Sequence, residues 1–311
     1  MARGHSKTVT YAVVGSGVVG TRVVQHLTSL GLAPALYSHK QRTELLSKSV
    51  VVLACARPHA QLATMLIDEG VSVVSVSDNV SDIMDLLALH DRAVAHNARL
   101  VPGAACVPGM SGLLVSHVAK AFDVMDEVHV AVHGTGGPSC AREHHDSLSG
   151  RAFGWHDGEW IERPSGSGRE LCWFPDPIDA KDCYRYASAE PMLLQRIAPS
   201  LQRITARVSA TRRDRLTAHL PMLSPPHAEG GVGGLRVEAR GSRNGVRHNE
   251  IVGMAEKVAS VAAAVAAHTA LRVGDCAPGV HVLGEATLPN ADILTAVLAS
   301  GLTLHQFVGH E

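Results

Sequence analysis

The feature that most constrains the fold of this chain is a glycine-rich turn near its start, Gly15-Ser-Gly-Val-Val-Gly20. Before the turn, residues 9–14 form a short apolar run rich in β-branched residues, which predicts one buried strand. After the turn, apolar residues recur at helical spacing as far as Gly31, a residue type that commonly ends helices. The turn therefore joins a strand to a helix, which is the context that a GxGxxG dinucleotide-binding motif requires.

Each glycine of this motif has its own physical role. Gly15 allows the tight turn, Gly17 lets the backbone approach a pyrophosphate, and Gly20 lets helix and strand pack closely. The phosphates would bind to the free N–H groups at the helix N-terminus. The predicted cofactor-binding residues here are Gly15, Ser16, Gly17, Val18, Val19 and Gly20. The alternative is a turn whose glycines serve packing alone.

The end of the second predicted strand discriminates between NAD(H) and NADP(H). This position normally carries Asp or Glu to bind the ribose 2′-hydroxyl, but residues 37–42 read Tyr-Ser-His-Lys-Gln-Arg and contain no carboxylate. Ser38, Lys40 and Arg42, with His39 between them, could bind a 2′-phosphate by charge-assisted hydrogen bonds. We therefore predict NADP(H), with NAD(H) possible; the alternative for Lys40 and Arg42 is an ordinary solvated loop.

The overall composition describes an ordinary globular protein. The chain has 311 residues, 46% of them hydrophobic, and a formal net charge of -1, which favours two domains and neither nucleic acid nor an anionic membrane as partner. The longest apolar segment, residues 258–267, is too short to span a bilayer, and the start of the chain lacks a signal-peptide core. We expect a cytoplasmic protein that binds a small molecule, and by default a homodimer.

The cysteines and histidines show no metal-binding pattern. The six cysteines form no CxxC pair, and the 19 histidines contain no HExxH motif. We therefore expect neither a disulfide framework nor a metal site.

Strands and helices alternate through about residue 122. Continuous apolar runs at residues 49–56 and 71–76 are typical of parallel strands buried on both faces. This pattern predicts an α/β fold with a Rossmann-type doubly wound parallel sheet over residues 1–122. The turns at Gly15, Pro58, Asp78 and Cys106 should then line one crevice, because ligands bind at the carboxyl ends of such strands.

From residue 123 the pattern changes to that of half-exposed strands. Residues 127–133 alternate with period two, further strands are expected at 160–161, 169–174, 203–210 and 234–240, and Asn244-Gly245 is a hairpin signal. We predict a second, α+β, mostly antiparallel substrate domain over residues 123–249. A helix over 250–271, a helix over 290–300 and a strand over 302–308 would form a last segment, 250–311, that packs back on the nucleotide domain.

Several separated segments together resemble the saccharopine dehydrogenase-like family of NAD(P)-dependent oxidoreductases. Besides the glycine motif, they are Leu53-Ala-Cys-Ala-Arg-Pro58, Val74-Ser-Val-Ser-Asp-Asn79, Cys106-Val-Pro-Gly-Met110, Trp173-Phe-Pro-Asp-Pro-Ile178 with Asp182-Cys-Tyr184, and Ala277-Pro-Gly-Val-His281. The resemblance implies hydride transfer between nicotinamide and the C–N carbon of an amino acid or its imine.

Three departures from the family pattern lie where a substrate would bind. Val107 stands where an acidic residue is common, Arg57 where a glycine is common, and residues 136–146 replace a turn rich in Ser and Thr. The family resemblance therefore does not identify the substrate.

Polar residues near the predicted crevice suggest the catalytic groups. Asp78 could anchor a substrate amine or cap the next helix. His144 and His145 are candidate general acids, and on a helix they would point about 100° apart, so one could face a ligand. In a second cluster Tyr184 could donate a proton, and Arg185, beside Asp182, could bind a carboxylate. The alternatives are surface histidines and a solvated loop.

The remaining candidates lie at strand ends. Pro108 and Gly109 suit the nicotinamide ribose or carboxamide, although a plain helix start explains them equally well. We place Ala56, Arg57 and Pro58 in the same cofactor site. Cys106 is assigned to the substrate pocket, with a small buried residue as the alternative.

These observations predict an NADP(H)-dependent oxidoreductase that transfers hydride to or from the C–N or carbonyl carbon of an amino-acid-derived small molecule. The alternatives are an NAD-dependent amino acid dehydrogenase and a non-catalytic protein that senses a dinucleotide.

Overall fold

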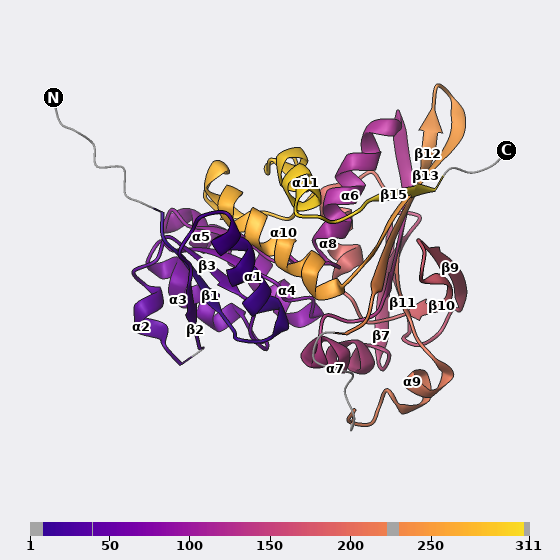
Figure 1. The fold of residues 1–311 in the computed structure, drawn as a ribbon. Helices are drawn as coiled ribbons and strands as arrows, with labels where there is room; N and C mark the ends of the chain where they lie inside the picture. Colours follow the sequence, from indigo (N-terminus) through magenta and orange to yellow (C-terminus); the bar gives the residue numbers. More distant parts are fainter. Residues whose placement is uncertain (1–8, 39, 223–229, 308–311) are drawn as a thin grey trace.

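The computed structural model describes residues 9–38, 40–222 and 230–307, which form two sheets (Figure 1). In the first sheet all paired strands run parallel, in the order β14-β5-β4-β3-β1-β2. Its strands are β1 (Tyr11–Val14), β2 (Ala35–Tyr37), β3 (Val50–Leu53), β4 (Ser72–Ser75), β5 (Arg99–Val101) and β14 (Gly279–Val280). The predicted Rossmann-type sheet is confirmed.

Both faces of this sheet are covered, which explains its continuous apolar strands. Val50 and Val52 of β3 belong to one core, and Val51 and Leu53 belong to another on the opposite face. The helices between the strands are α1 (Val18–Ser29), α2 (Arg42–Leu45), α3 (Ala60–Asp68), α4 (Val80–Leu87) and α5 (His90–Ala95). From β1 the chain passes to β2 on one side and then crosses to β3 on the other. The carboxyl ends of β1 and β3 therefore form a topological switch point, where such sheets bind ligands.

The second sheet is mostly antiparallel, as predicted. The strands along its path follow the order β15-β13-β12-β6-β11-β10-β9, with β7 and β8 attached at β11, and of these pairs β6 and β11 run parallel. They are β6 (Val124–His133), β7 (Arg151–His156), β8 (Glu159–Pro164), β9 (Glu170–Phe174), β10 (Asp179–Arg185), β11 (Arg203–Ser209), β12 (Gly233–Arg243), β13 (Val246–Glu256) and β15 (His305–Phe307). The hairpin turn between β12 and β13 is at Asn244 and Gly245, whose φ angles of 51° and 76° are the positive values that a tight two-residue turn requires.

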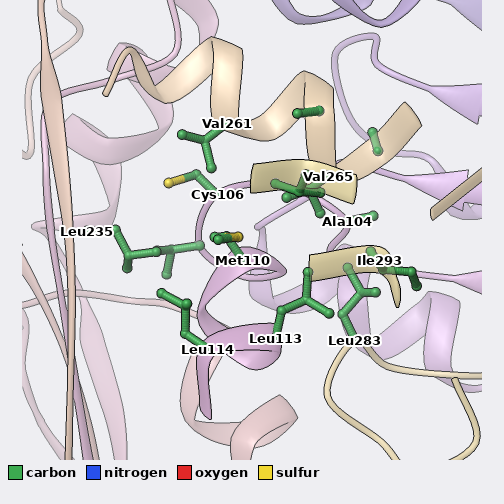
Figure 2. Packing of buried hydrophobic residues seen from close by; sticks show 14 of the residues in the cluster. Ala104, Cys106, Met110, Leu113, Leu114, Leu235, Val261, Val265, Leu283 and Ile293 are labelled. Atoms are coloured by element: carbon green, nitrogen blue, oxygen red, sulfur yellow. The ribbon is translucent and has the colours of Figure 1, made fainter. Parts of the chain in front are cut away.

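The helices α6 (Met110–Val118), α10 (Val258–Arg272) and α11 (Asn290–Ala299) contribute to one apolar core that joins the two sheets. The other helices of this part of the chain are α7 (Pro138–Ser147), α8 (Glu190–Ile197) and α9 (Arg212–Thr217), with short 3-10 turns at Ala119–Ala121 and Val273–Asp275. Figure 2 shows Val261 and Val265 of α10 beside Met110 of α6, with Leu235 of β12 and Ile293 of α11 in the same cluster. Among the described residues, no helix combines the length and hydropathy that crossing a bilayer would take.

The helix α10 is buried on nearly every side. It contacts α1, β3 and β4 of the first sheet's layer as well as α6 and α11 (Figure 1). Seven of its 15 residues are alanine, and these small side chains let neighbouring elements approach closely. A helix that is apolar all round is typical of a protein interior.

The C-terminal segment differs from the prediction in two respects. We expected a helix from residue 250, but β13 pairs with β12 as far as Glu256 and α10 begins at Val258, so the boundary at 249/250 falls inside a strand. We also expected the last strand to pack on the nucleotide domain. Instead β15 pairs with β13 of the second sheet, while β14 extends the edge of the first. Residue 308 of the predicted strand lies outside the described residues.

Replacing Gly112 tests the close packing of α6. A Cβ at this position would lie 2.1 Å from the carbonyl oxygen of Leu283. In a helix interior Ala normally stabilises by about 1 kcal/mol relative to Gly, but here we expect Gly112→Ala to lower the free energy of unfolding by about 1–3 kcal/mol, because backbone must move. Urea denaturation measures this change. Gly274→Ala, whose Cβ would meet no described atom within 4 Å, should stay within about 0.5 kcal/mol of the wild type.

Candidate active site

A cavity of about 1050 Å³ lies at the carboxyl ends of the parallel strands, at the switch point. One wall comes from the turns that follow β1, β3, β4 and β5. The opposite wall comes from the second domain, through residues 136–144 and the start of α10. The lining residues include Gly15, Ser16, Gly17, Val18, Val19, Arg22, Gln25, Ser38, Cys55, Ala56, Arg57, Asp78, Cys106, Val107, Cys140, Glu143, His144 and Val258.

The glycine motif has the geometry of a phosphate-binding turn. Gly15 has a φ of 118°, and its N–H donates to the carbonyl oxygen of Tyr37 at 3.0 Å. A Cβ on Gly20 would lie 1.9 Å from the Gly15 carbonyl oxygen, whereas a Cβ on Gly17 would meet no described atom within 4 Å. Gly15 and Gly20 are therefore required by the protein itself, while Gly17 leaves open space at the N-terminus of α1. This cradle fits a dinucleotide pyrophosphate.

The predicted 2′-phosphate site is described in part. Ser38 lines the cavity, and its N–H and hydroxyl both donate to Oε1 of Gln41, at 3.0 and 3.2 Å. Lys40 is exposed and does not line the cavity. His39 and the side chain of Arg42 lie outside the described residues.

Two cavity residues on α1 were missed from the sequence. Arg22 and Gln25 lie three residues apart and so share one face of the helix. Arg22 also donates to the hydroxyl of Ser260 on α10. Polar residues at this spacing directly after a glycine motif are the signal that could have identified them.

Residues 136–146, which replace a turn of the family pattern, lie largely in the helix α7. Pro138 occupies its first turn, where proline is favoured because its missing N–H has no partner there. The helix turns Cys140, Glu143 and His144 toward the cavity. Their spacing of three and four residues places them on one helical face. Neither Cys140 nor Glu143 was among the residues predicted from the sequence.

The two adjacent histidines point in different directions. His144 lines the cavity, whereas His145 is 6% exposed and its Nε2–H donates to the carbonyl oxygens of Thr217 and Leu220, at 2.9 and 3.2 Å. The placement of His145 contradicts the catalytic role that we considered for it.

Four polar side chains converge at the inner end of the cavity. His144 Nε2 lies 3.8 Å from Oδ2 of Asp78 and 3.8 Å from Sγ of Cys140. Glu143 Oε1 lies 3.4 Å from Nε of Arg57. We call Asp78, Cys140, Glu143 and His144 the polar cluster. Asp78 does not cap the next helix, because Asn79 does: its side chain accepts from the N–H of Asp82.

Burial and charge shift the titration of two groups in the polar cluster. Burial lowers the pKa of His144, but its interactions with Cys140, Asp78 and Glu143 outweigh burial and raise that pKa to about 9. The pKa of Glu143 is raised above its ordinary value by burial and by the Asp78 carboxylate, against the opposing effect of Arg57. The cluster therefore holds protons near neutral pH.

The other predicted polar cluster lies elsewhere. Asp182, Tyr184 and Arg185 belong to the strand β10, and none of them lines this cavity. Oδ1 of Asp182 lies 2.9 Å from Nε of Arg169, and the ring of Tyr184 is covered by the guanidinium of Arg215, 4.0 Å from its centroid. This placement contradicts the substrate and catalytic roles that we considered, because β11 separates β10 from β6 and the cavity.

The turn after β5 contributes through Ala105, Cys106 and Val107 rather than through Pro108 and Gly109. Gly109 has a φ of 120°, and a Cβ there would lie 2.5 Å from backbone atoms of Ala105, so it serves the turn into α6. Burial raises the pKa of the Cys106 thiol to about 12, which keeps it protonated. Pro58 likewise lies beside the lining residues Arg57 and His59 without lining the cavity itself.

A smaller cavity of about 350 Å³ adjoins the first. The two share Arg57, Asp78, Val107, Glu143 and His144, so the polar cluster lies between them. The far walls of the smaller cavity include Met84, Tyr186 and Ser188. It offers room for a small molecule next to the larger cavity.

Alanine at two positions of the glycine motif should affect two different properties, ligand binding at Gly17 and stability at Gly20. Gly17→Ala should leave the melting temperature unchanged but weaken binding of a nicotinamide dinucleotide at least about tenfold, because the methyl group would occupy space that the pyrophosphate needs. Gly20→Ala should lower stability by about 1–3 kcal/mol through its clash with Gly15. Thermal melting and fluorescence titration separate the two effects. Unchanged affinity of Gly17→Ala for both NADH and NADPH would contradict the assignment of this turn.

The fold matches those of several solved enzyme structures. Saccharopine dehydrogenase (L-Glu forming) from Saccharomyces cerevisiae matches with a TM-score of 0.64 at 13% identity, over 96% of this chain and 100% of that one. Homospermidine synthase from Legionella pneumophila, in complex with NAD, matches with a TM-score of 0.70 at 12% identity, over 97% and 92%.

The DAP dehydrogenase of C. glutamicum, in complex with DAP, gives a TM-score of 0.51 at 13% identity, over 92% of this chain and 95% of that one. No family model matches the sequence, and no curated protein sequence matches it either. The resemblance predicted from the sequence is thus confirmed at the level of the fold: this chain has the fold of saccharopine dehydrogenase and of homospermidine synthase.

Proposed function

We propose that this protein is an NADP(H)-dependent oxidoreductase that transfers hydride to or from the C–N or carbonyl carbon of an amino-acid-derived small molecule. The observation that carries the proposal is a single cavity that runs from the glycine motif to the polar cluster. A dinucleotide bound there would supply the hydride through its nicotinamide ring. The protein must then bind the substrate, orient it and move one proton.

The charges around the polar cluster suit an amino-acid-like substrate. The carboxyl groups of Asp78 and Glu143 can bind an ammonium group, and the guanidinium of Arg57 can bind a carboxylate. Both kinds of charge face the smaller cavity, so one small zwitterion could contact them together. The similar solved structures are named for saccharopine, homospermidine and DAP, and these names support a substrate that reacts at a C–N bond.

The proton donor in this proposal comes from α7. Glu143 and His144 are the ionisable residues that the helix turns toward both cavities. They lie next to each other in the chain, and Asp78 and Arg57 hold their side chains from the opposite wall. A group fixed on a helix keeps its geometry during the reaction better than one on a loop.

A substrate panel tests the proposed reaction. We expect oxidation of NADPH, followed by nicotinamide absorbance, with at least one imine formed from a 2-oxo acid and an amine. Glu143→Gln and His144→Gln should lower kcat on the order of 10²- to 10⁴-fold, the range typical of lost acid–base catalysis, with cofactor affinity unchanged.

Arg142→Gln is the matched control on the same helix. Its side chain is exposed and does not line either cavity, so kcat should stay within a few-fold of the wild type. Dinucleotide binding without turnover of any imine, amino acid or carbonyl compound in a broad panel would instead support the non-catalytic alternative, a protein that senses a dinucleotide.

The cofactor preference has its own test. Residues 37–42 carry no carboxylate that would repel a 2′-phosphate, and Ser38 lines the cavity. The double variant Lys40→Ala, Arg42→Ala should reduce the affinity ratio of NADPH to NADH by about 10- to 100-fold, the effect of losing charged hydrogen bonds.

Lys48→Ala serves as the control for this double variant, because Nζ of Lys48 lies over the ring of Tyr37, 5.7 Å from its centroid, rather than in the loop. Fluorescence titration with both dinucleotides measures the ratio. A preference for NADH in the wild type would favour the NAD-dependent amino acid dehydrogenase.

A further inference from the structure

We propose that Asp78, Cys140 and His144 bind a divalent metal ion, Zn²⁺ by ligand preference, at the boundary of the two cavities. Their ligand atoms, a carboxylate oxygen, Sγ and an imidazole nitrogen, all lie within 4.8 Å of one another. These residues come from two walls of the cavity: Asp78 from the turn after β4, and the other two from α7. Carboxylate, thiolate and imidazole are the ligand types that Zn²⁺ prefers.

The separation between His144 and Asp78 fits a metal site better than a hydrogen bond. His144 Nε2 lies 3.8 Å from Oδ2 of Asp78, beyond the range of about 2.7–3.2 Å for a good N–H···O bond. Two ligands at tetrahedral angles around zinc are about 3.3 Å apart for N and O, and about 3.6 Å for N and S. The two 3.8 Å separations from His144 are thus within about half an ångström of these values, and the ligand atoms of Asp78 and Cys140 lie within 4.8 Å of each other.

Within the described part of the chain, the imidazole of His144 makes no hydrogen bond that competes with Asp78 and Cys140. Its Nδ1 is buried and has no hydrogen-bond partner among the described residues. Its Nε2 contacts Cys140 and Asp78. Cys140 and His144 are four residues apart on α7, the helical spacing at which two ligands can reach one ion.

The ligand set also balances charge and leaves room for a further ligand. A thiolate and a carboxylate neutralise a divalent cation, and the imidazole binds in its neutral form. Three protein ligands with an open position are typical of catalytic rather than structural zinc sites. Here Asp78 and His144 line both cavities, so the open position would face a bound small molecule.

A bound ion would change the roles of the neighbouring residues. It would bind an oxygen or nitrogen lone pair of the substrate, and because His144 would then be a ligand, Glu143 would be the proton donor. This consequence rests on the proposed function, whereas binding of the ion does not. We expected no metal site because the cysteines and histidines lack short-range ligand spacing, whereas Asp78 lies 62 residues before Cys140.

Metal titration of the whole protein tests the site without using activity. We expect chelator-treated wild type to bind one Zn²⁺ per chain, and Co²⁺ in its place to give a thiolate-to-metal charge-transfer band. Cys140→Ala, Asp78→Asn and His144→Gln should each weaken Zn²⁺ binding at least about 100-fold, because even changes to residues that only support a ligand cost about 10- to 100-fold. Cys140→Ala should also abolish the band.

Cys55→Ala is the matched control, because this thiol lines the same cavity but is not in the ligand set. It should keep both the zinc affinity and the cobalt band. Thermal melting monitors folding. If a substitution on α7 disturbs the helix, the zinc affinity of Asp78→Asn tests the site instead, because Asp78 lies outside α7. Absence of one-to-one binding in the wild type, or a cobalt band that persists in Cys140→Ala, would overturn the proposal.

Discussion

The packing of α10 between the two sheets is the constraint on which the rest of the structure depends. This alanine-rich helix contacts α1, β3 and β4 on one side and α6 and α11 on the other, so a single core contains strand residues from both sheets. Because protein interiors are close-packed, a shared core fixes the position of one sheet against the other. The start of α10 also lines the cavity at Val258. The helix that joins the two domains therefore also forms part of the cavity wall.

This arrangement explains why the site is composite. The first domain provides the glycine motif and Asp78 at the ends of parallel strands, where the N–H groups of a helix N-terminus can bind an anion. The second domain provides α7, which brings Cys140, Glu143 and His144 to the opposite wall. Neither domain contains the whole site, so the position of α7 over the strand ends decides which groups can act on a bound molecule.

The two proposals use the same wall of the cavity but have different physical grounds. Dinucleotide binding depends on local backbone geometry at Gly15, Gly17 and Gly20, where the protein leaves space beside a helix N-terminus. Ion binding depends on side chains from both walls of the cavity. Nε2 of His144 lies 3.8 Å from Oδ2 of Asp78, too far for a good hydrogen bond, and Cys140 lies on the same side of the cavity as His144. Hydride transfer and metal binding can therefore be examined separately in the same protein.

The sequence by itself determined the local features of this protein. The parallel sheet, the glycine turn and the Asn244-Gly245 hairpin follow from periodicity and backbone preferences that act over a few residues. The tertiary structure decided that His144 faces the cavity while His145 does not, that Asp182, Tyr184 and Arg185 lie on the far side of β11, and that Cys140 meets Asp78. These outcomes depend on how helices and sheets pack across long sequence separations, which no local pattern encodes.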